Sequence, residues 1–335
     1  MEQGGSALSK YRYSQATAPR WFSLSVFLAF VAVFPAVSPN AYFLNILGFA
    51  GIYVLLCTGL NILMGYAGQV SLGHAAFWGL GAYISGVLTA KFGWPPVVAL
   101  AASVVGTCVV ALAVGIPTLR LKGHYLAMAT LGVGMIFHTF FVQFADLTGG
   151  PSGLVDVPSF SVGSIAIGTT LGNYYFIWAW VAIGLMGALN LSQSRMGRAL
   201  NAIKGSEIAA ECMGVDTYRY KVIIFVLSAA YAAIAGSLYV HSINFVAPAT
   251  FGFMSSVLLL TMVVVGGIGA FWGPVIGACI LSLLPEYLRA YEGLEVLLYG
   301  LILVGVMMFM PNGLAPLFSN LRLRFRSVNR AEGGG

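Results

Sequence analysis

The stretch AYFLNILGFAGIYVLLCTGLNIL, residues 41–63, contains no Asp, Glu, Lys or Arg and is apolar on every side. Its length lies within the about 17–25 residues that an α-helix needs to cross the hydrocarbon core of a bilayer. Similar runs recur along the chain, of which 59% is apolar and 8% charged, whereas soluble domains are roughly 45–50% apolar. The sequence therefore predicts a protein that crosses a membrane many times.

The predicted fold class is all-α, a polytopic transmembrane helical bundle of about ten spans. A membrane β-barrel is excluded because its strands alternate apolar and polar residues, which these runs do not. The eighth and ninth expected spans are short and rich in glycine, so a re-entrant or broken helix is an alternative there. The expected spans lie near residues 21–38, 41–63, 69–90, 95–117, 124–144, 173–192, 222–242, 254–270, 271–289 and 294–311.

Polar segments bound the membrane region. We expect residues 1–20 to be a cytoplasmic tail, residues 21–316 to form the membrane domain, and residues 317–335 to be a basic cytoplasmic tail. With both termini on the cytoplasmic side, fourteen Lys and Arg lie inside and two, Lys91 and Arg289, lie outside. Cytoplasmic loops carry such an excess of Lys and Arg, so the net charge of +6 indicates topology rather than nucleic-acid binding.

The internal segment 193–221 is unusually charged and is predicted to be the largest cytoplasmic loop. Within it, Ser206 can cap a two-turn helix that runs from Glu207 to Met213, and Gly214 suits the left-handed position that ends such a helix. The apolar side of this helix would hold Ile208, Cys212 and Met213. From the residues alone, two interpretations stay open: a solvated loop that only fixes topology, or a helix that a partner protein receives.

Residues 195–239, RMGRALNAIKGSEIAAECMGVDTYRYKVIIFVLSAAYAAIAGSLY, resemble the cytoplasmic loop and following span of LivM-type permeases, membrane subunits of branched-chain amino acid ABC importers. The likeness covers roughly residues 40 to 315. Three further regions carry it in the same order: GLNILMGYAGQVSLGHAAFWGLGAY (59–83), PTLRLKGHYLAMATLGVGMIF (117–137) with LTGGPSGL (147–154), and VVGGIGAFWGPVIGA (264–278).

The resemblance implies that the charged segment is a coupling helix that docks on a cytosolic ATPase. In this segment Ile208 stands where the family usually has a Glu, and Glu207 lies one residue earlier. Further along the chain, His124, Met135 and His138 replace an Asp, a Glu and an Arg that are usual in the family. The implied coupling residues are Glu207, Ile208, Ala209, Ala210, Cys212, Met213 and Gly214.

Polar residues in the spans are candidates for the translocation path. Gln69, Ser71 and His74 lie in a glycine-rich region and either line that path or serve helix packing, and His138 needs a partner or water within its span. The resemblance alone suggests that an external segment docks a binding protein or forms a gate. That segment contains Thr148, Gly149, Gly150 and Pro151.

The expected function is that of a permease subunit that carries a branched-chain or other apolar amino acid inward. The implied partners are a second, LivH-like permease, two cytosolic ABC ATPases, an extracytoplasmic solute-binding protein and membrane lipid, in a bacterial inner membrane. We expect no nucleic acid and no cofactor. We also expect no metal, because no pair of Cys and no cluster of His has the spacing of metal ligands. A permease for urea or a short amide is the alternative.

Two other classes are disfavoured. An ion-coupled carrier usually keeps a charged residue within its bundle, and none lies well inside the ten expected spans. A membrane enzyme would cluster histidines with carboxylates, but the four histidines are scattered. The chain also lacks the GxxxxGK[ST] motif that cradles ATP phosphates, so ATP hydrolysis would belong to a separate polypeptide.

Overall fold

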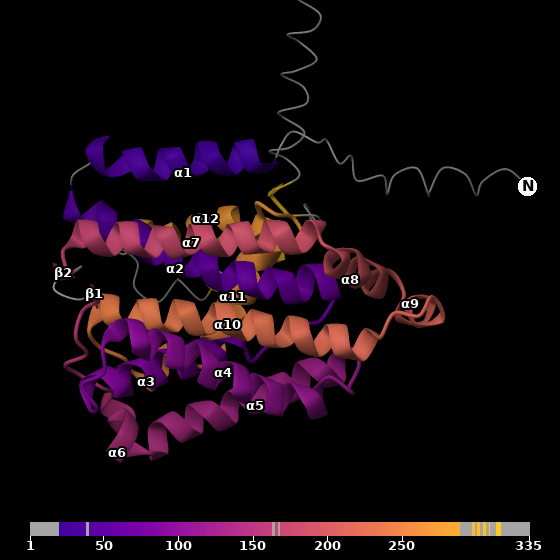
Figure 1. Cartoon of the computed structure of the whole chain (residues 1–335), viewed down its shortest axis with the longest axis horizontal. Coiled ribbons are helices and arrows are strands. Elements are labelled where there is room, and N and C mark those ends of the chain that lie inside the picture. The colour runs from indigo at the N-terminus through magenta and orange to yellow at the C-terminus, as the bar shows by residue number, and fades with distance from the viewer. Residues whose placement is uncertain are drawn as a thin grey trace, which may run out of the picture. The chain divides into compact units, whose positions relative to one another are not determined.

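The computed structural model describes residues 20–37, 40–162, 165–166, 168–288 and 313–315, with residues 297, 298, 300, 301, 304, 305 and 308 (Figure 1). The helices are α1 (Arg20–Val37), α2 (Ala41–Asn61), α3 (His74–Ala90), α4 (Pro96–Thr118), α5 (His124–Gln143), α6 (Ala145–Thr148), α7 (Thr170–Gln193), α8 (Arg195–Gly205), α9 (Glu207–Cys212), α10 (Thr217–Ile243), α11 (Phe253–Gly266) and α12 (Gly273–Leu288). Helix α1 belongs to one compact unit, and the residues from Asn40 onward form another.

A few short elements connect these helices. The π-helical turn Ile62–Tyr66 continues α2, and 3-10 turns cover Gly150–Ser152 and Pro248–Phe251. Strand β1 (Ser161–Val162) pairs with β2 (Ile165–Ala166) in an antiparallel register. The described part of the chain is therefore helical apart from loops and this two-residue pairing.

Five helical segments are long and apolar enough to cross a bilayer: Ala41–Tyr66, α4, α5, α7 and α10. Helices also occupy the expected first, third, eighth and ninth spans, while most of the tenth, 294–311, lies outside the described residues. The all-α, multi-pass prediction is confirmed. The count of ten spans stays a prediction, as does the side on which the two tails lie, since these tails are outside the described ranges almost entirely.

The third span starts later than predicted. We expected a helix from residue 69, but α3 begins at His74, and residues 68–73 are not helical. Gly68 has a φ of +68°, a left-handed conformation that glycine adopts at little cost and that ends the π-helical turn. The segment 68–73 therefore runs non-helically into the start of α3.

The eighth and ninth spans form two separate short helices. Helix α11 has 14 residues and is about 21 Å long at 1.5 Å per residue, which is less than the roughly 30 Å of a bilayer core. Residues 267–272 separate it from α12, which has 16 residues. The two helices match the expected eighth and ninth spans in position, and the alternative of a re-entrant or broken helix stays a prediction.

The interior of the second unit is built by close approach of helix backbones. Helix α10 packs against α3, α4 and α2 (Figure 1). A Cβ added at Gly236 of α10 would collide with the carbonyl oxygen of Trp78, and one added at Gly81 of α3 would collide with the backbone of Ala233. Small residues permit such contacts, and dispersion then stabilises them where water supplies no hydrophobic force.

The two ends of this unit differ in chemistry. Helices α8 and α9 lie at one end, and α6, β1 and β2 lie at the other (Figure 1). At the α8–α9 end, Lys122 and Lys221 form ion pairs with Glu207. At the α6 end, Leu154 pairs with Val246 through two backbone hydrogen bonds, and buried His241 contacts the Pro158 carbonyl oxygen at 2.7 Å.

The packing predicts a contrast between two glycines. Gly236→Ala should reduce the free energy of unfolding by about 1–3 kcal/mol, because the added methyl group overpacks the α3–α10 contact. Gly132→Ala in α5 is the matched control, since nothing lies within 4 Å of its added Cβ. Thermal unfolding in detergent measures both variants, and equal melting temperatures would contradict the proposed role of the Gly236 contact.

Candidate functional site

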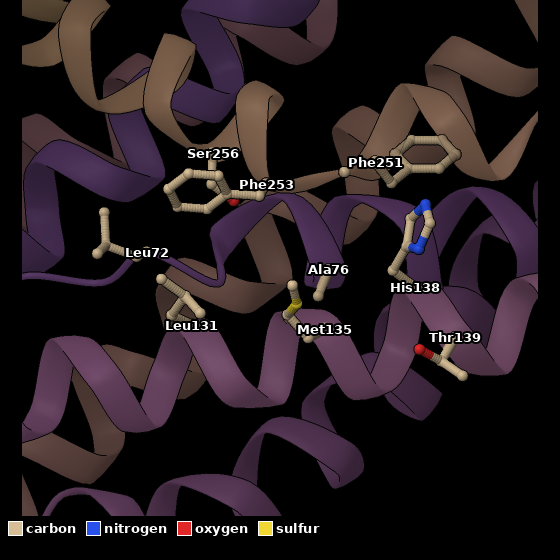
Figure 2. A pocket seen from close by; sticks show the side chains of 11 residues that line it. Leu72, Ala76, Leu131, Met135, His138, Thr139, Phe251, Phe253 and Ser256 are labelled. Atoms are coloured by element: carbon tan, nitrogen blue, oxygen red, sulfur yellow. The ribbon is translucent and has the colours of Figure 1, made fainter.

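A cavity of about 250 Å³ lies between α5, the start of α3 and the segment that leads into α11 (Figure 2). Helix α5 contributes one face to it, with Leu131, Met135 and His138 at spacings of three and four residues. The opposite wall includes Phe251 and Phe253. The complete lining is Leu72, Ala76, Leu131, Gly134, Met135, His138, Thr139, Phe251, Gly252, Phe253 and Ser256. None of these lining residues is an acid, a lysine or an arginine.

Local contacts fix the walls of this apolar cavity. The amide of Leu72 donates to Thr130 Oγ1 at 3.1 Å, and a Cβ at Gly73 would collide with the Thr130 carbonyl oxygen. The segment 68–73 is therefore pressed against α5. The amide of Ala75 donates to Ser256 Oγ at 3.2 Å, which ties the first turn of α3 to α11.

His138 is the predicted path residue that the structure places in this cavity. The side chain is half-buried, and Figure 2 shows its imidazole on the cavity side of α5, opposite Phe251. Met135, which occupies a position where an acid is usual in LivM-type sequences, is 56% exposed and also lines the cavity. Both residues therefore lie where a solute in the cavity would meet them.

The other predicted path residues are buried beside the cavity. Gln69, Ser71 and His74 are 4%, 1% and 1% exposed, respectively. The amide group of Gln69, the hydroxyl of Ser71 and Nε2 of His74 have no hydrogen-bond partner in the described part of the chain. Ser71 and His74 are not in the wall of the apolar cavity, and Gln69 lines a different one. Their role in the path stays a prediction.

The charged segment folds as two helices, α8 and α9, and its second helix is the predicted one. Ser206 caps α9 by accepting a hydrogen bond from the amide of Ala209 at 3.3 Å. Gly214 has a φ of +81° just beyond the helix, as predicted. Asp216 then caps α10 by accepting from the amide of Arg219 at 3.1 Å. Helix α8 was not predicted, although Ser194 caps it in the same way.

Helix α9 presents apolar side chains outward. Ile208 is 72% exposed and Met213 is 84% exposed, and Cys212 is also exposed. Ala210, by contrast, is 3% exposed and faces the interior of this chain. Of the seven predicted coupling residues, Ala210 is therefore the one whose side chain a docking partner would not reach. Exposed apolar side chains on a polar segment are typical of a partner-binding surface.

Glu207 is held within the chain by two lysines. Its carboxylate accepts a hydrogen bond from Lys221 Nζ at 2.5 Å and lies 3.7 Å from Lys122 Nζ. Burial raises the pKa of Glu207, but the hydrogen bond and charge of Lys221, together with the charge of Lys122, outweigh it and hold the pKa below its usual value. Glu207 therefore joins α9 to α10 and to the loop before α5.

Lys204 connects α8 to the membrane-embedded part of the chain. Its Nζ donates to the carbonyl oxygen of Gly65 in the π-helical turn at 2.8 Å. Gly65 also touches the backbone of Gly269, so that a Cβ at Gly65 would collide with it. Asn61 fixes the same junction by accepting from the Gly269 amide at 2.8 Å and donating to the Ala270 carbonyl oxygen at 3.1 Å. These contacts have no local signal in the sequence, because they join residues far apart in the chain.

The predicted external segment is a tightly packed turn. The Thr148 hydroxyl donates to the carbonyl oxygens of Phe141 and Phe144 at 2.7 and 2.8 Å, and it accepts from the Gly150 amide at 3.2 Å. Thr148 and Gly150 are buried, whereas Pro151 is exposed. Gly149 and Gly150 have φ values of +79° and +62°. Pro151 is thus the member of the predicted set that protrudes furthest toward a possible partner.

The depressed pKa of Glu207 predicts pH-dependent stability. The stabilisation that the Glu207 carboxylate contributes should be complete above the unfolded-state pKa of about 4.3. It should be lost as pH falls through the lower folded-state pKa. Glu207→Gln should therefore lower the free energy of unfolding by about 1–3 kcal/mol at pH 7, because the buried Lys221 ammonium loses the negative charge that pairs with it, and by much less at low pH.

Thermal unfolding in detergent at several pH values measures this effect. Glu211→Gln on the same helix is the control, because a glutamine can still accept the hydrogen bond that Glu211 receives from Thr217. A Glu207→Gln effect that is equally large at pH 7 and below about pH 3.5 would show that the ion pairs do not account for it.

Comparison with known proteins identifies the family to which the chain is similar. A family model described as "Branched-chain amino acid transport system / permease component" matches residues 42–311. The high-affinity branched-chain amino acid transport permease LivM of Escherichia coli K12 is 30% identical over 294 residues, 79% of this chain and 68% of LivM.

Two further relatives are also permeases of branched-chain amino acid transport systems. LivH of the same organism is 29% identical over 287 residues, which cover 78% of this chain and 90% of LivH. BraD of Pseudomonas aeruginosa is 25% identical over 285 residues, 78% of this chain and 91% of BraD. No solved structure matches the chain. A family model that spans most of the chain, together with a relative that is 30% identical, shows that this chain belongs to the family of branched-chain amino acid transport permeases.

Proposed function

We propose that this permease forms part of the translocation path for a branched-chain or other apolar amino acid and couples it to ATP hydrolysis in separate subunits. The observation that carries the proposal is the cavity against α5, which has an apolar lining and no acid, lysine or arginine in its wall. Its volume of about 250 Å³ is below the roughly 300–1,000 Å³ of pockets for drug-sized ligands. A small solute with one apolar side chain fits these limits.

The chemistry of the cavity favours an apolar side chain over a wholly polar solute. Leu131, Met135 and Phe253 line it, and burying a side chain such as that of leucine against them would contribute about 1.5–3 kcal/mol. Urea and short amides have no such group to bury, so this alternative is not favoured. Ser256, Thr139 and His138 would supply the few polar contacts that orient a solute.

The assembly we propose contains a second, LivH-like permease, two cytosolic ABC ATPases and an extracytoplasmic solute-binding protein, in a bacterial inner membrane. Met135 is 56% exposed at the edge of the cavity, so a second permease that covers α5 would complete its wall. The turn at residues 148–151 would face the binding protein through the exposed Pro151, with Thr148, Gly149 and Gly150 fixing its shape. This arrangement requires both tails and α8–α9 to lie on the cytoplasmic side.

Coupling would start at α9. Ile208, Cys212 and Met213 would pack into the ATPase, while Glu207 and Ala210 attach α9 to the rest of this chain. Displacement of α9 and α8 would then act on the π-helical turn through Lys204 and Gly65. This turn leads directly into segment 68–73, which borders the apolar cavity through Leu72.

The proposal is tested by reconstituting the complex that co-purifies with this chain into proteoliposomes with a solute-binding protein. We expect ATP-dependent accumulation of radiolabelled leucine, isoleucine or valine and no accumulation of urea. Uptake that follows an ion gradient and ignores ATP, or a chain that purifies without ATPase subunits under conditions that preserve other membrane complexes, would overturn it.

The exposed apolar side of α9 yields a further prediction. Ile208→Asp and Met213→Asp should each reduce ATPase binding and leucine uptake by about tenfold or more, because a charge placed in a desolvated contact is costly. Both side chains are exposed in this chain, so its own stability should change little. Co-purification of the ATPase and uptake in proteoliposomes measure the two effects.

Asn201→Asp on α8 is the matched control. Its side chain is exposed and lies near the same end of the bundle, so it introduces the same charge outside α9. If Asn201→Asp and Ile208→Asp reduce ATPase binding equally, the loss reflects added negative charge and not the apolar contact.

A further inference from the structure

A second cavity, of about 450 Å³, lies at the α8–α9 end of the second unit. Five segments that are distant in sequence build its wall. They are residues 67–70 before α3, residues 121–127 around the start of α5, Ile203 and Lys204 of α8, Glu207 of α9 and Lys221 of α10. The helices that would move during coupling therefore meet at this cavity.

The second cavity continues the apolar one along the same helix face. His124 and Ala127 line the second cavity, and Leu131, Met135 and His138 line the first. These positions recur every three or four residues, so they lie on one side of α5. On the facing wall, residues 69 and 70 line the second cavity, and Leu72 and Ala76 line the first. The two cavities therefore follow one another along α5, and the contact of Leu72 and Gly73 with Thr130 separates them.

Positive charge dominates the lining of the second cavity. Three lysines, Lys122, Lys204 and Lys221, line it with a single carboxylate, that of Glu207. Glu207 is paired closely with Lys221 and more loosely with Lys122, at 3.7 Å. Within the described ranges, Lys204 has no carboxylate partner and donates to the Gly65 carbonyl oxygen. An ammonium group has three donors, so Lys204 and Lys122 retain hydrogens for a ligand.

The side chain of Gln69 is an independent indication that the second cavity receives a polar ligand. It belongs to this wall and is 4% exposed, yet neither its side-chain oxygen nor its nitrogen has a hydrogen-bond partner in the described part of the chain. A buried amide without partners is costly. A polar ligand group beside Gln69 would remove that cost.

We propose that this cavity binds an oxyanion, a carboxylate or a phosphate, between Lys122, Lys204 and the Gln69 amide. Two sources share this chemistry. One is the carboxylate of the solute as it leaves the apolar cavity, which rests on the function proposed above. The other is the phosphate of an anionic phospholipid, since basic pockets at the membrane surface bind such headgroups.

Thermal stabilisation of the full chain, purified with its associated subunits in detergent, distinguishes these sources. Two matched pairs of probes are titrated: leucine against leucinamide, which lacks the carboxylate, and phosphatidylglycerol against phosphatidylcholine in mixed micelles. The variant Lys122→Gln removes one cation whose side chain is 70% exposed. Arg120→Gln is the control, because it removes the same charge two residues away and is not part of the lining.

We expect leucine to stabilise the protein more than leucinamide, or phosphatidylglycerol to stabilise it more than phosphatidylcholine, or both. That difference should weaken by about tenfold in apparent affinity in Lys122→Gln, as for the loss of one charge-assisted hydrogen bond, and should persist in Arg120→Gln. A difference within the leucine pair identifies the solute carboxylate, and one within the lipid pair identifies a phospholipid phosphate that no headgroup cation neutralises. The variant Lys204→Gln should weaken the same difference, and Arg198→Gln is its control.

The proposal is overturned if neither pair differs, or if the differences are the same in Lys122→Gln and Arg120→Gln. Its failure is separable from that of the proposed function. A complex that imports leucine with ATP but shows no lysine-dependent difference lacks the oxyanion site alone. A complex that imports no amino acid but shows a Lys122-dependent lipid effect retains the site and loses the proposed function.

Discussion

Contact between helix backbones is the constraint on which this structure depends. In a lipid environment apolar side chains gain nothing by leaving the solvent, so helices are held by dispersion at short range and by hydrogen bonds. Gly81 and Gly236 bring α3 and α10 together, Gly73 brings the start of α3 onto α5, and Gly65 meets Gly269. Each contact would be lost with a single added methyl group, and each borders either the interior or a cavity.

The position of segment 68–73 explains why the two cavities have chemically different walls. Where segment 68–73 lies against α5, the apolar cavity is enclosed by aliphatic and aromatic groups. Where the same segment approaches α8, lysines and an unsatisfied amide form the wall. One short non-helical segment therefore separates an apolar compartment from a cationic one, and a lysine of α8 contacts the turn from which that segment emerges.

The sequence was most informative where structure is decided locally. Charge-free runs predicted the helices, and Ser206 and Gly214 predicted the start and end of α9, because capping involves residues three positions apart or fewer. The burial of Ala210, the two lysines on Glu207 and the contact between Lys204 and Gly65 were not predictable in this way. They depend on how α8, α9 and α10 pack, and no local pattern encodes that.

The lining of the apolar cavity could be predicted only in part, because most of it depends on how the helices pack. His138 was noticeable because a polar side chain is rare in a span, and it lines the apolar cavity. Leu131 and Phe253 were not identified, because an apolar residue that faces a cavity has the same pattern as one that faces lipid or a neighbouring helix. Burial and geometry separate these cases, and composition does not.

The Thr148 turn has a mechanical consequence. Its hydroxyl binds two carbonyl oxygens at the end of α5 and the amide of Gly150, and Leu154 then pairs with Val246 just beyond α10. The tip at Pro151 is therefore attached to the end of α5 on one side and to the chain beyond α10 on the other. If α5 tilts relative to α10 to open or close the cavity along its face, the strain falls on this tip, so a protein seated on Pro151 would sense the state of the cavity without touching the solute.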